Sequence, residues 1–161
     1  MTIYICDDSK SDLLRLNHHL QEYLSHQDQK ITIESFQSGE ELLRRYEETM
    51  EKPSLIFLDI YMDGITGMEA ARRIRNQSDD CILVFVTTSS EFAVESYDVN
   101  AAYYLLKPFQ PEKLCQILDS FRLKEALHAR YIEIISDRVP VRVPLHSILY
   151  ADPFRNAVCL H

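Results

Sequence analysis

The sequence predicts an α/β fold in which helices cover both faces of one doubly wound parallel sheet. Short apolar runs alternate with amphipathic segments five times between residue 2 and about residue 128. This alternation is typical of strand-helix units joined by right-handed crossovers. Several of the short runs are apolar at nearly every position, which indicates strands that are buried on both faces.

The period of the hydrophobic residues distinguishes the expected strands from the expected helices. Strands are expected at 2–6, 31–36, 54–60, 82–88 and 102–107. Helices are expected at 11–24, 38–50, 66–75, 91–100 and 111–130. Ser38 with Glu41, and Thr66 with Glu69, have the spacing of capping boxes at helix starts. Pro111 suits the first turn of the last helix.

The composition is that of a globular domain without a basic surface over the whole chain. Of the 161 residues, 46% are hydrophobic and 26% charged, which argues against disorder. A net charge of -8 and a pI near 5.2 give no overall attraction to nucleic acids or anionic membranes. No segment approaches the roughly 18 apolar residues of a membrane helix. The first ten residues lack a secretory pattern, so a cytoplasmic protein without membrane contact is expected.

The four cysteines, at positions 6, 81, 115 and 159, are widely spaced. They form no C-x-x-C pair and have no neighbouring histidine cluster, so neither a zinc site nor a disulfide framework is indicated. Reduced thiols in a cytosol are the expected state.

The pattern changes after about residue 130. Residues 131–161 contain β-branched and aromatic residues, three prolines and no helical period. This segment predicts two to four short strands, which are too few to form an independent core. We expect it to be the opening of a second, all-β domain.

Polar residues follow four of the five predicted strands. Asp7 and Asp8 follow the first, Asp59 lies near the end of the third, Thr87 and Thr88 end the fourth, and Lys107 ends the fifth. Because the carboxyl ends of parallel strands share one edge of the sheet, we expect these side chains to lie together.

Three carboxylates at one edge need positive charge nearby. Two unit charges ~4 Å apart repel by about 4 kcal/mol at an effective dielectric near 20. Mg²⁺ would supply that charge and prefers oxygen ligands. Asp59 would then act as a nucleophile towards a phosphoryl donor, with Lys107 and Thr87 binding oxygens of the transferred group.

These segments resemble the receiver domain of two-component response regulators. The resemblance is carried by "CDD" at 6–8, "LDIYMDGITG" at 58–67, "VTT" at 86–88 and "YYLLKPF" at 103–109, and it covers residues 2 to 125. It implies a flavodoxin-like (βα)5 sheet with strand order 2-1-3-4-5. It also implies a phosphoacceptor signalling domain that catalyses only its own phosphorylation and dephosphorylation.

The resemblance assigns a role to each matching residue. Asp59 would accept a phosphoryl group from a sensor histidine kinase. Asp7, Asp8, Asp59 and the backbone carbonyl of Tyr61 would hold Mg²⁺. Lys107 would pair with the phosphoryl group, Thr87 and Tyr104 would be the switch residues, and the Lys107–Pro108 peptide would be cis.

The same resemblance implies how the signal is passed on. Phosphorylation would draw Thr87 inward and let Tyr104 rotate towards the interior, which would change the face formed by the fourth helix, fifth strand and fifth helix. In related regulators this face often forms dimers, so a homodimer through residues 91–125 is expected.

The segment "VPLHSILYADPFRNAVCLH" at 143–161 is similar to the start of a LytTR DNA-binding domain. This similarity implies a receiver domain at 1–128 and an incomplete LytTR-like domain at 129–161. It implies a transcription regulator that contacts DNA only through that second, mostly missing domain.

Two positions depart from the common receiver pattern, and two others bear on the lifetime of the phosphoryl group. Asp63 stands where many receivers have proline, and Thr88 replaces a small residue and would narrow access to the phosphoryl group. Tyr61 and Ser89 occupy positions that tune phosphoryl lifetime in the family. A bulky Tyr61 would shield the acyl phosphate from water, so slow self-dephosphorylation is expected.

Three other functions fit parts of the pattern. A Mg²⁺-dependent aspartyl-phosphate phosphatase usually has a second acid two residues after the nucleophile, where this chain has Tyr61. A receiver-like interaction module that never takes phosphate is disfavoured by the complete acid, threonine and lysine set. A flavodoxin-like FMN protein fits the fold, but the acidic turn "CDDSKSD" lacks the glycine of a phosphate cradle.

Overall fold

The computed structural model describes every residue except 26–30, 129–130, 137–138, 145–150, 155–156 and 161. Side-chain burial is described for residues 1–25 and 31–121 and for four later positions. The chain divides into two compact units, Met1–Cys115 and Gln116–His161.

The first unit is built on a five-stranded parallel sheet with the order β2-β1-β3-β4-β5. The strands are β1 (Thr2–Cys6), β2 (Thr32–Phe36), β3 (Leu55–Leu58), β4 (Ile82–Thr87) and β5 (Tyr103–Leu106). All five predicted strands are present, and the implied strand order is confirmed. The expected third strand at 54–60 is shorter in the structure, because β3 ends at Leu58, directly before Asp59.

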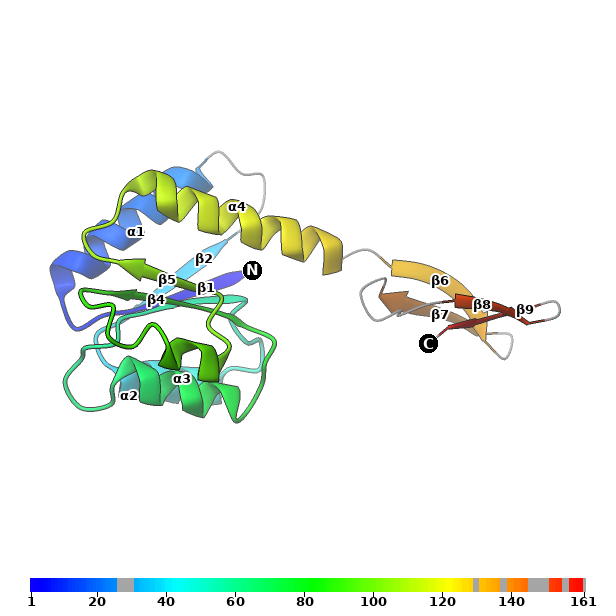
Figure 1. Ribbon diagram of the computed structural model, residues 1–161, viewed down its shortest axis with the longest axis horizontal. Helices are drawn as coiled ribbons and strands as arrows, with labels where there is room; N and C mark the ends of the chain where they lie inside the picture. The colour runs from blue at the N-terminus through cyan, green and yellow to red at the C-terminus, as the bar shows by residue number, and fades with distance from the viewer. Residues whose placement is uncertain (26–30, 129–130, 137–138, 145–150, 155–156, 161) are drawn as a thin grey trace. The chain divides into compact units, whose positions relative to one another are not determined.

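Helices lie on both faces of this sheet. They are α1 (Lys10–Leu24), α2 (Gly39–Glu48), α3 (Gly67–Arg75), the 3₁₀ helix η1 (Glu95–Val99) and α4 (Pro111–His128). Within the first unit, α1 and the start of α4 lie on one side of the sheet, and α2, α3 and η1 lie on the other (Figure 1). The doubly wound prediction is therefore confirmed.

The fourth expected helix, at 91–100, forms only in part. Residues 91–94 form turns, and η1 is a 3₁₀ helix of five residues. Asn100 follows it with a φ of 48°, a left-handed conformation that stops a right-handed helix and that asparagine tolerates better than most residues.

Side chains cap the first three helices at their amino ends. Ser38 accepts a hydrogen bond from the Glu41 amide, and Thr66 accepts one from the Glu69 amide, as the spacing predicts. The reciprocal half of each capping box differs from the expected form. The Glu41 carboxylate accepts from the Gln37 amide, and the Glu69 carboxylate pairs with Arg73.

The core lies between the sheet and its helices and includes all of β3. Its largest fully buried side chains include Tyr4, Tyr46, Phe57 and Phe85. The strands β1, β3 and β4 are buried at nearly every position because they occupy the centre of the sheet. Leu114, at the start of α4, is also buried, as are Ile117, Leu118 and Phe121 further along the same helix.

The second unit contains two antiparallel hairpins in its described parts. One pairs β6 (Tyr131–Ser136) with β7 (Val139–Pro144), and the other pairs β8 (Ala151–Phe154) with β9 (Ala157–Leu160). The prediction of two to four short strands is borne out. Among the residues described here each strand pairs with one other, so the prolines in β7 and β8 occur in edge strands, where a missing amide donor is tolerated.

Over the residues the structure describes, no helix is both long and apolar enough to cross a bilayer. Cys6, Cys81 and Cys115 are free thiols. The side chain of Cys159 lies outside the described residues.

Candidate functional site

The site forms where two neighbouring central strands end. β1 pairs with β3 so that Cys6 lies opposite Leu58, and each strand is followed at once by an aspartate. The Asp59 amide donates to the Cys6 carbonyl at 2.9 Å, which continues the strand pairing by one step. Asp7 and Asp59 are therefore placed side by side by the register of the sheet.

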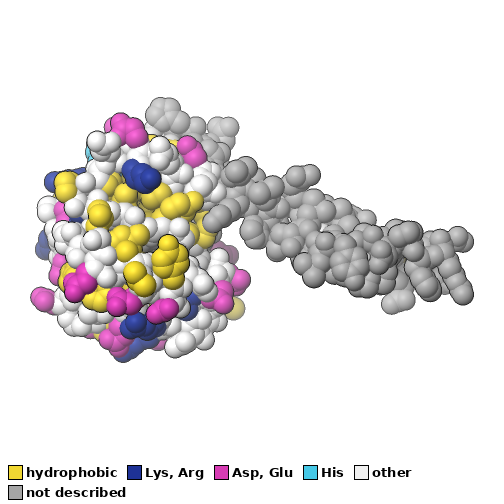
Figure 2. Space-filling view, viewed as in Figure 1, with side chains coloured by type: hydrophobic (Ala, Val, Ile, Leu, Met, Phe, Trp, Pro, Cys, Tyr) yellow, Lys and Arg dark blue, Asp and Glu magenta, His cyan; other side chains and the backbone are white. Residues whose placement is uncertain are grey.

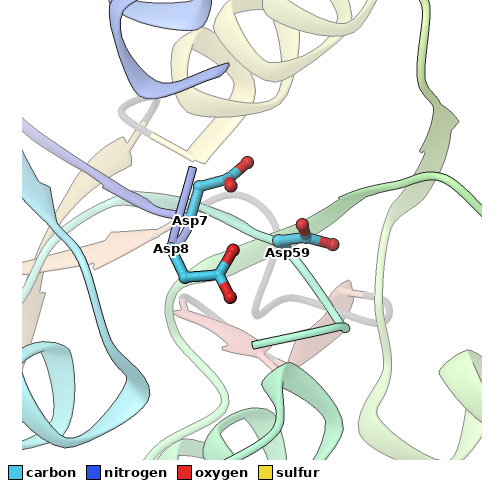
Figure 3. A group of neighbouring side chains, drawn as sticks. All are labelled: Asp7, Asp8 and Asp59. Carbon is cyan, nitrogen blue, oxygen red and sulfur yellow. The ribbon is translucent and has the colours of Figure 1, made fainter. Parts of the chain in front are cut away.

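The three predicted acidic residues meet at this edge. Asp7, Asp8 and Asp59 each offer a carboxylate oxygen, and these oxygens all lie within 4.8 Å of one another (Figure 3). Asp7 is 4% and Asp59 6% exposed, whereas Asp8 is exposed. At such separations each pair of charges repels by about 3 to 4 kcal/mol at an effective dielectric near 20. The cluster is stable only with cations close by.

Lys107 supplies a positive charge from the end of β5. Its ammonium group donates to Asp7 Oδ2 at 2.5 Å, to Asp59 Oδ2 at 2.9 Å and to Asp12 Oδ2 at 3.1 Å. Its backbone amide donates to the Thr87 carbonyl at 2.7 Å, which fixes it next to β4. The Lys107–Pro108 peptide bond is cis.

Two pKa values reflect this arrangement. Burial alone would lower the pKa of Lys107, but its hydrogen bonds to Asp7 and Asp59 outweigh burial, and the pKa lies above its usual range. Burial raises the pKa of Asp7, and the hydrogen bonds from Lys107 and the Ser9 amide offset that rise only in part. Lys107 is therefore fully charged, whereas the ionised form of Asp7 is costly and would gain from another cation.

The donor set fits a hard divalent cation. All the side-chain ligands are carboxylate oxygens, which Mg²⁺ prefers, and Asp8 is open to solvent, so bound water can complete the coordination. Lys107 contacts the Oδ2 atoms of Asp7 and Asp59. The Oδ1 atom of Asp7 accepts a hydrogen bond from the Ser9 amide, and the Oδ1 atom of Asp59 accepts one from the Tyr61 amide at 3.3 Å. The predicted role of the Tyr61 carbonyl as a ligand stays a prediction.

Thr87 ends β4 and is completely buried. Within the described parts of the chain its hydroxyl has no hydrogen-bond partner. A buried hydroxyl without a partner costs roughly 1 to 3 kcal/mol. The last residue of β4 therefore carries an unused donor, on the strand that pairs with β3, and β3 ends directly before Asp59.

Of the other predicted positions, Tyr104 lies in β5, whereas Tyr61, Asp63 and Thr88 lie in the loops after β3 and β4. Tyr104 is half-buried, and its hydroxyl donates to the Ser89 carbonyl at 2.5 Å. Thr88 and Asp63 are exposed. The Tyr61 side chain is 43% exposed, and its hydroxyl donates to Glu91 at 2.9 Å.

Gly67 allows the helix α3 to approach the site closely. A Cβ atom at this position would lie 2.0 Å from the Asp59 carbonyl oxygen, and the Gly67 amide donates to the Ile60 carbonyl at 3.0 Å. No side chain fits here, so the first turn of α3 packs directly on the backbone of the aspartate that is expected to react.

Two residues at the site were not anticipated from the sequence. Asp12, in the first turn of α1, is the third carboxylate on Lys107. The feature of the sequence that could have indicated Asp12 is its position four residues after Asp8. Glu91, which accepts the hydrogen bond from Tyr61, lies in the turn before η1, and no hydrophobic period in the sequence indicates its position.

The family model described as the response regulator receiver domain matches residues 3–119. The chain belongs to this family. The receiver is the signalling domain of two-component response regulators, and the resemblance drawn from the site motifs is confirmed.

Related proteins and structures agree with this assignment. The sensory transduction protein LytT of Oceanobacillus iheyensis is 40% identical over 94 residues, which are 56% of this chain and 37% of that protein. The response regulatory domain of MrkE from Klebsiella pneumoniae superposes with a TM-score of 0.68 at 27% identity, covering 77% of this chain and 97% of that one. TrrA from Thermotoga maritima, solved in complex with Mg²⁺-BeF, gives a TM-score of 0.64 at 27% identity and covers 74% and 97% of the two chains.

The chain spans well under half the length of the LytT protein it matches. The family match ends at residue 119, and α4 continues unbroken to His128. The expected domain boundary at 128/129 and the LytTR-like character of residues 129–161 therefore stay predictions.

Proposed function

We propose that this receiver accepts a phosphoryl group on Asp59 from a sensor histidine kinase, with Mg²⁺ bound at Asp7, Asp8 and Asp59. The observation that carries the proposal is the meeting of Asp59 with two further carboxylates and the Lys107 ammonium group at one edge of the sheet. The similar protein TrrA, whose crystal structure is a complex with Mg²⁺-BeF, supports the choice of metal.

The residues divide the work of the transfer. A carboxylate oxygen of Asp59 forms a bond to phosphorus as the bond to the donor breaks, and the leaving group takes that electron pair. Lys107, already 2.9 Å from Asp59 Oδ2, would hydrogen-bond an oxygen of the arriving group. Bound Mg²⁺ would neutralise charge on the phosphoryl oxygens. The domain would catalyse only its own phosphorylation and dephosphorylation.

Thr87 and Tyr104 would convert phosphorylation of Asp59 into a change in the surface of the domain. The buried Thr87 hydroxyl has no partner among the described residues, so a phosphoryl oxygen nearby would provide one and draw the loop after β4 inward. Tyr104, now bonded to the Ser89 carbonyl in the same loop, would lose that contact and rotate. This is a two-state element biased by a local charge.

The surface over η1 and β5 is the proposed output face. Val94 and Tyr97 are 78% and 77% exposed and Leu106 is 44% exposed, and hydrophobic side chains gather over these elements on the face shown in Figure 2. We expect a homodimer through residues 91–125 after phosphorylation. Identical sedimentation before and after acetyl phosphate treatment would argue against it.

The output is proposed to be transcription. The LytT relative and the motif at 143–161 support a LytTR-type DNA-binding domain that begins at about residue 129. DNA contact would then come from that domain and not from the acidic receiver. A cytoplasmic location is part of the same proposal.

Intact-mass measurement after treatment with acetyl phosphate and Mg²⁺ tests the proposal. The parent chain is expected to gain one phosphoryl mass, and Asp59→Asn none. Asp63→Asn is the matched control, because Asp63 is an exposed aspartate four residues away, and it should be modified like the parent. A parent chain that stays unmodified would favour a phosphorylation-independent interaction module.

A further inference from the structure

Carboxylates occupy all three N–H donors of the Lys107 ammonium group. An ammonium group has three donors and no acceptor. Asp7, Asp59 and Asp12 each accept one hydrogen bond from it, at 2.5, 2.9 and 3.1 Å respectively. An oxygen of an arriving phosphoryl group can therefore bind Lys107 only if one of these three contacts is lost.

The contact with Asp12 is the easiest of the three to lose. It is the longest, and the Asp12 side chain is 29% exposed, against 6% for Asp7 and 8% for Asp59. Separation of Lys107 from either of the two buried aspartates would leave a buried charge without its partner, which is costly. Asp12 can be hydrated instead, and the cavity that it lines together with Lys107 and Phe109 gives its carboxylate room to separate.

We propose that Asp12 is a positioning residue that competes with the phosphoryl group for Lys107 and thereby slows phosphorylation of Asp59. The inference rests on the proposed function. In the reaction with acetyl phosphate, an oxygen of Asp59 forms a bond to phosphorus while the bond from phosphorus to the acetyl oxygen breaks. Acetate leaves with that electron pair. Lys107 then donates to a phosphoryl oxygen the N–H that Asp12 had accepted.

The charge of Asp12 acts in the same direction as its hydrogen bond. Asp12 Oδ2 and Asp59 Oδ2 both contact the Lys107 nitrogen, so they lie no further apart than about 6 Å, the sum of the two contact distances. A phosphoryl donor that approaches Asp59 is an anion and is repelled at this range. Among the described residues, the carboxylates close enough together to hold one cation are Asp7, Asp8 and Asp59. Asp12 is outside that group, so a bound cation would neutralise its charge less.

The test compares rates of phosphorylation by acetyl phosphate at saturating Mg²⁺, followed by intact mass. Asp12→Ala removes both the competing acceptor and its charge, and it should be phosphorylated about two- to tenfold faster than the parent. Asp12→Asn removes the charge but keeps a neutral oxygen that accepts from Lys107, so its rate should lie between the two. Asp80→Asn is the matched control and should keep the parent rate. It removes one charge from an exposed aspartate just before β4, at the opposite edge of the sheet.

Ionic strength provides a second readout, which a purely structural role of Asp12 would not change. Screening weakens the repulsion between the donor and the Asp12 carboxylate, and the Debye length falls to about 3 Å at 1 M salt. The rate advantage of Asp12→Asn over the parent should therefore shrink as salt is added. An advantage that stays constant with salt would overturn the role of the charge.

The outcomes separate this inference from the proposed function. Equal rates for the parent, Asp12→Asn and Asp12→Ala would overturn the inference. Slower phosphorylation of Asp12→Ala would also overturn it, because Asp12 would then support Lys107 and not compete for it. An Asp80→Asn rate raised as much as that of Asp12→Asn would reduce the effect to net charge, with the same consequence. In all of these cases the parent would still be phosphorylated on Asp59. A parent chain that gained no phosphoryl group would instead overturn the proposed function.

Discussion

Replacement of Gly67 by alanine is the sharpest test of how the site is built. The new Cβ atom would lie 2.0 Å from the Asp59 carbonyl oxygen, 2.8 Å from its carbonyl carbon and 2.9 Å from the Ile60 Cα atom. All three atoms belong to backbone, so no rotamer change relieves the contact. Ordinary contacts begin near 3.4 Å, so α3 and the backbone that follows β3 must separate by about 1.4 Å.

The energetic cost follows from this displacement. Overpacking of this kind costs about 1 to 3 kcal/mol, and the backbone contact places it near the upper end. The higher helix propensity of alanine offsets at most about 1 kcal/mol of this cost. We expect the free energy of unfolding to fall by about 2 kcal/mol or more. We also expect slower phosphorylation of Asp59, because its backbone moves relative to Lys107.

Urea unfolding and the rate of modification by acetyl phosphate measure the two effects. Gly64→Ala is the control. Its φ of 77° makes alanine unfavourable by about 1 to 2 kcal/mol, but the atoms that its Cβ would meet belong to the flexible Glu40 side chain. That variant should lose stability and keep the parent phosphorylation rate in its folded fraction. The reasoning is refuted if Gly67→Ala keeps the parent midpoint and the parent rate.

Three further predictions concern single side chains. Asp8→Asn should lower the affinity for Mg²⁺ at least about tenfold in a calorimetric titration, whereas Asp63→Asn should leave it unchanged. Equal Mg²⁺ affinities of the parent and Asp8→Asn would show that Asp8 is not part of the site. Asp12→Asn should lower the free energy of unfolding by about 1 kcal/mol or less, because its ion pair with Lys107 is partly solvated, and the loss should shrink with added salt. Burial raises the pKa of Tyr46 to about 12. The phenol of the unfolded chain loses its proton near pH 10, while the buried phenol of the folded chain keeps it. The free energy of unfolding of the parent should therefore fall by about 1 kcal/mol relative to that of Tyr46→Phe between pH 9 and 11. If the two proteins give parallel curves of stability against pH, this prediction is wrong.

The sheet was predictable because its strands carry two strong signals. Runs such as "LIFL" at 55–58 are apolar on both faces, which places them in the centre of the sheet, and amphipathic segments separate them at regular intervals. The exact end of β3 was not predictable, since Ile60 is apolar and buried although it lies beyond the strand. The weak fourth helix was not predictable either, because the left-handed turn at Asn100 depends on conformation and not on period.

The acidic cluster followed from one geometric rule. Parallel strands bring their carboxyl ends to the same edge, and this rule places Asp7, Asp59 and Lys107 together without knowledge of any contact. The rule concerns only strand ends. Asp12 on a helix and Glu91 in a loop fall outside it, and their contacts with Lys107 and Tyr61 depend on side-chain directions that a single sequence does not reveal.

The ion pair between Lys107 and Asp7 joins residues 100 positions apart. No short peptide from this chain contains both, so the proposed binding of a cation at the sheet edge would depend on the intact tertiary structure. Saturating magnesium should therefore raise the thermal midpoint by mass action, because the ion would bind the native state and would have no matching site on the denatured chain. The same linkage makes a melting curve an assay for occupancy, even for variants that no longer accept phosphate.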